Sequence, residues 1–235
     1  MNYHLIIISI SSLLLFSCAE SNNNQVNHNS NNKNHEMHDS HAMETLTVEK
    51  RIAFMSGHVE AGLALYRAGK PEQAAKHLLH PVSEMHEAER VGIDSLGFNA
   101  EVFKSVSKAL AEGKSAIEIE QMLKEAEENI MLIQKNAGGN LKDIITFLME
   151  TTVAEYKAGV SDGKIIEAGE YQDAFGFSVV ALKMSNGTEN NRSAILTQEL
   201  MKLVNMWPQE GPLADATPKP IETIIKQTQS VLESL

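Results

Sequence analysis

From about residue 45 onward, apolar positions recur every three or four residues, which is the pattern of amphipathic helices. The first run contains Ile52, Val59 and Tyr66. Gly69-Lys70-Pro71 should end this helix and begin a second one, which Pro81 should end or kink. Further helices are predicted at about 82–90, 98–112, 115–135, 141–158, 164–185, 191–206 and 219–234.

No segment shows the sustained alternation of apolar and polar residues that is typical of a strand. The predicted fold is therefore all-α. About seven to eight helices in total, joined by short connections, should form one or two bundles. The strongest internal break is Ala137-Gly138-Gly139-Asn140. It predicts an N-terminal helical subdomain, residues 45–137, and a C-terminal helical subdomain, residues 138–235.

The N-terminal end has a different pattern. Residues 5–16 are apolar but too short to span a bilayer comfortably, as in the apolar region of a signal peptide. The following Leu15-Phe16-Ser17-Cys18 resembles a bacterial lipobox, although the region before it contains His4 and no Lys or Arg. The resemblance implies that residues 1–17 are a lipoprotein signal peptide and that Cys18 is acylated, as with palmitate. A lone buried cysteine in an apolar segment is the alternative.

Ala19 follows Cys18, in place of the Asp that resembles an inner-membrane retention signal. We therefore expect a lipid anchor in the outer membrane, with the body of the protein facing the periplasm. Cys18 is the single cysteine, which excludes an intrachain disulfide.

Residues 18–44 are predicted to be a disordered tether rich in Asn and His, because residues 21–34 contain eight Asn and almost nothing apolar. The end of this tether carries acidic and Met side chains beside three His side chains that could capture a transition metal. These are His35, His38 and His41. The alternative is a polar linker that happens to contain His.

The net charge and the absence of catalytic motifs argue against two classes of function. The net charge of −11 argues against nucleic-acid binding through a broad basic face. The chain has no Gly-x-Ser-x-Gly elbow, no phosphate-binding glycine loop and no His-Glu-x-x-His sequence, so we do not expect an enzyme.

Histidine and glutamate side chains form the best candidate for chemistry. If the second helix continued through Pro81 with a kink, two histidines and two glutamates between residues 77 and 87 would share one stripe of that helix. The hairpin at residues 69–71 would bring His58 of the first helix alongside this stripe. The set is His58, His77, His80, Glu84 and Glu87. Imidazole and carboxylate ligands suit a divalent transition metal, iron or zinc. Alternatively, His80 simply ends a helix and the glutamates form a solvated face.

A second acidic position lies on the predicted helix 164–185. Glu170 and Asp173 fall on an apolar stripe, where an unpaired buried charge is costly, so each needs a partner or a cation. Both are secondary metal candidates. Pairing with Lys142, Lys157 or Lys183 is the favoured alternative.

Two family resemblances bear on function. Gly57-His58, residues 64–69, and residues 77–81 with Glu84 resemble exported bacterial helical proteins of undefined function. Residues 155–160, 163–166 and 170–173 look like the helical periplasmic domain attached to some high-affinity iron permeases, without the permease's Arg-Glu-Gly-Leu-Glu motif. This resemblance implies periplasmic metal handling, with iron favoured.

The sequence therefore favours a membrane-anchored periplasmic lipoprotein that binds or delivers a transition metal. Its expected partners are the membrane, through the lipid, and an envelope or metal-transport protein. Residues 64–74 also look like the turn of a tetratricopeptide repeat, but no second copy follows in register. The alternative is thus a metal-free helical scaffold that docks to a cell-envelope partner.

Overall fold

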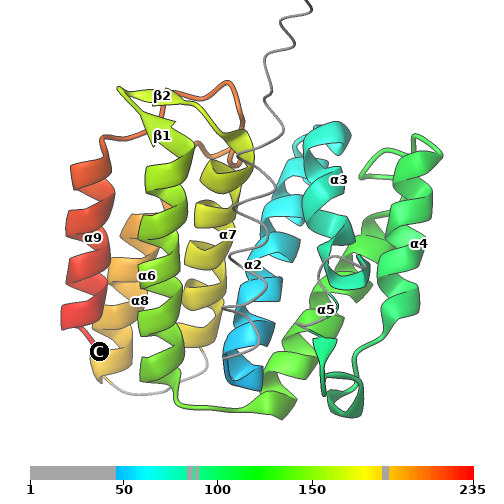
Figure 1. Ribbon diagram of the computed structural model, residues 1–235, viewed down its shortest axis with the longest axis horizontal. Helices are drawn as coiled ribbons and strands as arrows, with labels where there is room; N and C mark the ends of the chain where they lie inside the picture. Colours follow the sequence, from blue (N-terminus) through cyan, green and yellow to red (C-terminus); the bar gives the residue numbers. More distant parts are fainter. Residues whose placement is uncertain (1–45, 84–86, 88–89, 187–190) are drawn as a thin grey trace, which may run out of the picture.

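The structure is a computed structural model that describes residues 46–83, 87, 90–186 and 191–235. These residues form eight α-helices, which confirms the all-α fold (Figure 1). The helices are α2 (Val48–Arg67), α3 (Pro71–Leu79), α4 (Ala100–Ala111), α5 (Glu120–Ala137), α6 (Leu141–Gly159), α7 (Ala168–Ser185), α8 (Asn191–Val204) and α9 (Ile221–Glu233). The described part also contains the short 3₁₀-helices η1 (His80–Val82) and η3 (Asp94–Leu96) and a hairpin of β1 (Val160–Ser161) and β2 (Lys164–Ile165).

Helix α2 lies in the middle of the molecule, with α6 to α9 on one side and α3 to α5 on the other (Figure 1). Its Ala53 and Phe54 belong to the apolar core built by α6 to α9. Its Ile52, Met55 and Val59 belong to a second core, shared with α3, α4 and α5. Because α2 contributes to both cores, the division into subdomains 45–137 and 138–235 stays a prediction.

Local sequence signals explain several helix ends. Gly69, with φ +72°, follows α2, and Pro71 is the first residue of α3, where its missing N–H costs nothing. The side chain of Asn140 accepts hydrogen bonds from the Lys142 and Asp143 N–H groups and caps α6.

Two expectations about the helices were wrong. Where a helix was expected at 82–90, α3 ends at Leu79, η1 follows, and Ser83 is extended. Proline inside a helix removes a hydrogen bond and clashes with the preceding turn, so Pro81 ends the helix instead of kinking it. The described residues of 82–90 contain no α-helix. The helix expected from residue 164 begins only at Ala168, because Asp162-Gly163 closes the β-hairpin.

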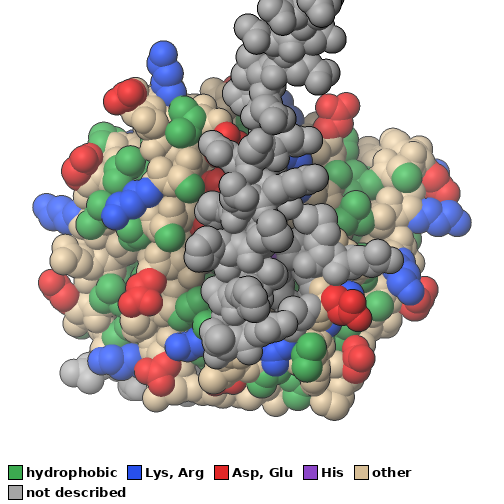
Figure 2. All heavy atoms as spheres, viewed as in Figure 1, with side chains coloured by type: hydrophobic (Ala, Val, Ile, Leu, Met, Phe, Trp, Pro, Cys, Tyr) green, Lys and Arg blue, Asp and Glu red, His purple; other side chains and the backbone are tan. Residues whose placement is uncertain are grey.

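Charged side chains of both signs are mixed over the face shown in Figure 2, which displays no broad basic patch outside the grey atoms. Among the described residues, no helix has the length and apolar character needed to cross a bilayer. The predicted signal peptide, Cys18, and the tether with His35, His38 and His41 lie outside the described residues.

Candidate metal centre

Helices α2 and α7 approach each other through glycine. A Cβ atom on Gly176 would lie 1.9 Å from the carbonyl oxygen of Gly57, and a Cβ on Gly57 would lie 2.1 Å from a ring carbon of Phe177. Only glycine fits at such a backbone contact. The close approach brings His58, the residue after Gly57, towards Asp173, which lies one turn before Gly176.

A third glycine brings α3 to the same place. A Cβ atom on Gly62 of α2 would lie 2.7 Å from Leu78 Cγ and 3.0 Å from His77 Cβ. Together with the hairpin at Gly69-Lys70-Pro71, this contact places His77 beside α2 and α7.

The three side chains converge on one carboxylate oxygen. His58 Nδ1 lies 2.8 Å and His77 Nδ1 lies 2.9 Å from Asp173 Oδ1. One potential ligand atom from each residue lies within 4.8 Å of the other two. His77 and Asp173 are buried, and His58 is nearly so. Both distances are within the range of a hydrogen bond donated by a ring N–H to a carboxylate oxygen.

Asp173 is held in its charged form. Burial alone would raise the pKa of its carboxyl, but the adjacent His58 and His77 imidazoles hold this pKa well below its usual value. The cluster therefore combines a carboxylate with two imidazole nitrogens in a site shielded from water.

Aromatic rings surround His58. Its ring stacks on that of His80, with centroids 3.8 Å apart and planes 14° apart. The centroids of Phe54 and Phe177 lie 4.8 and 5.6 Å from that of His58. His80 is buried beside the cluster, but it does not contribute one of the three converging ligand atoms.

A second layer of polar groups holds His77. Its Nε2 lies 2.9 Å from Gln172 Oε1, and Gln172 Nε2 donates to Gln73 Oε1 at 2.7 Å. Metal-binding histidines typically donate their second ring nitrogen to an oxygen in this way.

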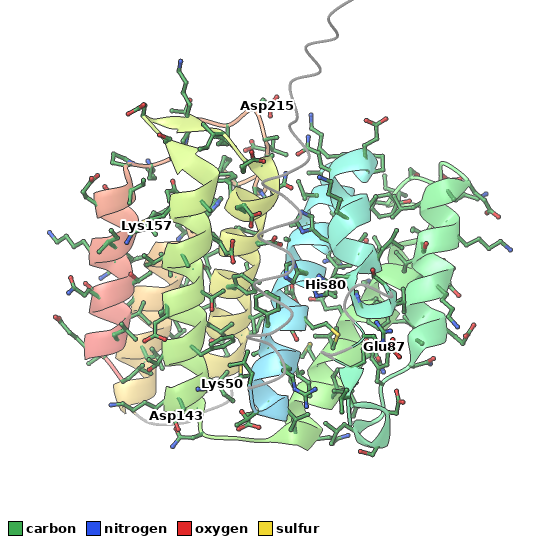
Figure 3. All side chains as sticks on the ribbon, in the orientation of Figure 1. Lys50, His80, Glu87, Asp143, Lys157 and Asp215 are labelled. Carbon is green, nitrogen blue, oxygen red and sulfur yellow. The ribbon has the colours of Figure 1, made fainter. Side chains whose placement is uncertain are left out.

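The structure thus brings together two of the five primary candidates, His58 and His77, and adds Asp173 from the secondary set. The shared stripe through Pro81 does not form, because α3 ends at Leu79. Glu87 is exposed in a 3₁₀ turn and lies on the α4 side of the molecule. Figure 3 labels both Glu87 and His80. Glu84 lies outside the described residues, and Glu170 is half-buried outside the three-residue cluster.

Lysine is not what pairs with Asp173. Lys183, one of the expected partners, binds Glu60 and Glu127 instead. The sequence signalled a buried carboxylate at position 173, but periodicity within one helix could not show that its partners come from α2 and α3. Gln172 and Gln73 were missed, since a single amide on a nearly apolar helix carries no distinctive pattern.

The donor set suits a transition metal. Two imidazoles and one carboxylate with open positions are characteristic of ferrous iron, and zinc accepts the same ligands. Adjacent ligands about 2.1 Å from an octahedral metal lie about 3.0 Å apart, and those of a tetrahedral metal about 3.4 Å. The separations of 2.8 and 2.9 Å come close to the octahedral spacing, and they equally match hydrogen bonds from ring N–H groups.

Comparison with known proteins concerns the C-terminal part of the chain. The comparisons with curated proteins and with solved structures give no match. One family model matches part of the chain. The matched segment contains α6 to α9 and therefore Asp173 and Gln172, whereas His58 and His77 lie before it. Residues 135–235 match the family described as the iron permease-associated 4-helix bundle domain.

Proposed function

We propose that this protein is an envelope lipoprotein that binds a divalent transition metal, with iron preferred over zinc, and delivers it to a metal-transport partner. The metal is held by His58, His77 and Asp173. One observation carries the proposal: two imidazole nitrogens converge at 2.8 and 2.9 Å on a single oxygen of a buried carboxylate.

The same three atoms can hold either protons or a cation. Without metal, a ring N–H of each imidazole can donate to Asp173 Oδ1 at these distances. A metal ion that displaces those protons would take one carboxylate oxygen and two imidazole nitrogens as ligands. Because binding requires neutral imidazole, the metal displaces any proton held there.

The choice of iron and of the cell envelope has separate support. Residues 135–235 match a domain associated with iron permeases, and Asp173 belongs to that segment. The lipobox-like sequence ending at Cys18 supports a lipid anchor, for which the outer membrane is the proposed location. The tether with His35, His38 and His41 is proposed to capture metal more weakly, because a segment that its sequence predicts to be disordered would have to become ordered to bind.

Metal content of the purified whole protein, together with calorimetric titration, tests the proposal. Zinc and, under anaerobic conditions, ferrous iron are the probes. The wild type should bind one equivalent tightly, and the double variant His77→Gln/Asp173→Asn should lose it. The triple variant His35→Gln/His38→Gln/His41→Gln should lose only weaker equivalents, and Glu170→Gln serves as a matched carboxylate control.

Identical titrations of the wild type and the His77→Gln/Asp173→Asn variant would refute the site. If the wild type bound neither metal, the metal-free scaffold alternative would be preferred. That alternative predicts instead that an envelope partner is captured equally by the wild type and the metal-site variants.

A further inference from the structure

The orientation of His77 can be traced to a backbone N–H group. The N–H of Ala214, in the segment between α8 and α9, can only donate, and it lies 3.4 Å from Gln73 Oε1. Gln73 therefore presents its oxygen, which also accepts from Gln172 Nε2 at 2.7 Å. This contact fixes the Gln172 amide, so that its oxygen faces His77 Nε2 at 2.9 Å.

The reverse arrangement is unfavourable. An amide oxygen can only accept, so His77 Nε2 must carry a proton in the observed arrangement. Giving Nε2 a lone pair would require both amides to turn over, and the NH₂ group of Gln73 would then face the N–H of Ala214. Two donors would meet in a partly buried place, at the cost of an unsatisfied backbone group.

We infer that Gln172 is a positioning residue that keeps the proton of His77 on Nε2 and directs the Nδ1 lone pair at the metal position beside Asp173. This inference rests on the proposed function for its purpose, but the protonation of His77 can be measured without any metal. The contact with Gln172 concerns Nε2 alone, so metal binding at Nδ1 leaves the Nε2 proton in place.

Each of the two amides lies close to a proposed ligand on the same helix. Gln172 directly precedes Asp173 on α7, and Gln73 lies one helical turn before His77 on α3. The same two helices thus supply two ligands and the two amides that orient one of them. Ala214 connects this network to the segment between α8 and α9.

The test measures His77 protonation and zinc affinity on the same variants of the whole protein. Long-range ¹H–¹⁵N spectra of the imidazoles distinguish protonated from unprotonated ring nitrogens, and His77→Gln identifies the signals of His77. Gln172→Met removes the acceptor with little change in size, and Gln172→Glu keeps an oxygen acceptor. Gln227→Met, which removes an amide bonded to Glu199 on the far side of the bundle, is the matched control.

We expect His77 Nε2 to be protonated in the metal-free wild type at pH 8, and in Gln172→Glu and Gln227→Met. In Gln172→Met the proton should move to Nδ1, where it can be donated to Asp173, and zinc should bind about 10- to 100-fold more weakly. Most of the affinity should be retained in Gln172→Glu, which a merely space-filling role for Gln172 would not predict.

An Nδ1-protonated, Nε2-unprotonated His77 in the wild type would overturn the inference. So would a Gln172→Met variant in which Nε2 keeps its proton. If Nε2 is protonated as expected and responds to Gln172→Met, but the wild type does not bind zinc or ferrous iron, the positioning by Gln172 is upheld and the proposed function fails.

Discussion

The ammonium group of Lys183 on α7 lies 2.8 Å from the carboxylate of Glu60 on α2, and Glu60 is buried. Lys183 also binds Glu127 of α5. This ion-paired cluster connects the central helix to one helix on each side. Glu60 lies two residues after His58 on α2, and Lys183 lies ten residues after Asp173 on α7. The ion pair therefore connects the same two helices that carry His58 and Asp173.

Replacing Lys183 with Met should destabilise the fold by about 3 kcal/mol, because it leaves a buried carboxylate without its cation. Burial raises the pKa of Glu60, and Lys183 opposes part of this rise. Without Lys183 the pKa of Glu60 rises further, so the folded state holds a proton that the unfolded state releases as the pH increases. The loss of stability should therefore be larger at pH 8 than at pH 5.

Urea unfolding at the two pH values measures this effect. Lys157→Met, which changes an exposed lysine on α6, is the control and should shift the free energy of unfolding by less than about 0.5 kcal/mol. An equal effect of both substitutions would show that the Lys183 cluster contributes nothing beyond an ordinary surface charge.

The glycine contact between α2 and α7 gives a second prediction. Gly176→Ala would place a methyl group 1.9 Å from the Gly57 carbonyl oxygen, so the helices must move apart, at a cost of about 3 kcal/mol or more. The separation would also pull Asp173 away from His58 and weaken zinc binding. Thermal unfolding and zinc titration of the same preparation measure the two effects.

Gly169→Ala on the same helix is the matched control, because a Cβ there meets no atom within 4 Å. Alanine should stabilise the protein by about 0.5 kcal/mol, since it is the better helix former. Zinc affinity should not change. Unaltered stability and affinity in Gly176→Ala would mean that the helices tolerate a wider separation than the structure shows.

Much of the fold follows from local signals in the sequence. Gly69, Pro71 and Asn140 mark helix ends that the structure confirms, because capping and backbone preferences act over only a few residues. The error at 82–90 has an equally local cause. Periodicity continued past Pro81, but the missing N–H of proline outweighed it.

The candidate site could be predicted only in part. His58 and His77 were found because the hairpin at 69–71 relates α2 to α3 through a short connection. The pairing of both with Asp173 joins residues 96 or more positions apart in the chain, and it depends on how α7 packs against α2. Glycines such as Gly57 and Gly176 allow that packing, but a lone glycine in a helical pattern does not disclose its neighbour.

Membrane attachment is tested at Cys18. Cys18→Ser removes the thiol that the lipobox resemblance predicts to be acylated, so the protein should leave the membrane fraction or keep its signal peptide uncleaved. Fractionation and the mass of the mature N-terminus measure both results. A processed Cys18→Ser protein that still sediments with membranes would exclude lipidation at this residue as the anchor.

The pH dependence of metal binding tests the ligand set itself. Imidazole binds metal only when neutral, so protons compete with zinc for the ring nitrogens and zinc affinity should fall as the pH is lowered. The pKa of Asp173 is held well below its usual value, so this carboxylate stays charged over the pH range of the titration and contributes no step. Because two imidazoles are involved, up to two protons are displaced by each metal ion, and the logarithm of the binding constant should fall by up to about two for each unit by which the pH is lowered. Removing one ligand by His58→Gln should reduce both the affinity and this slope. Zinc titrations between pH 5.5 and 8 distinguish the cases, and a slope unchanged by His58→Gln would show that His58 is not a ligand.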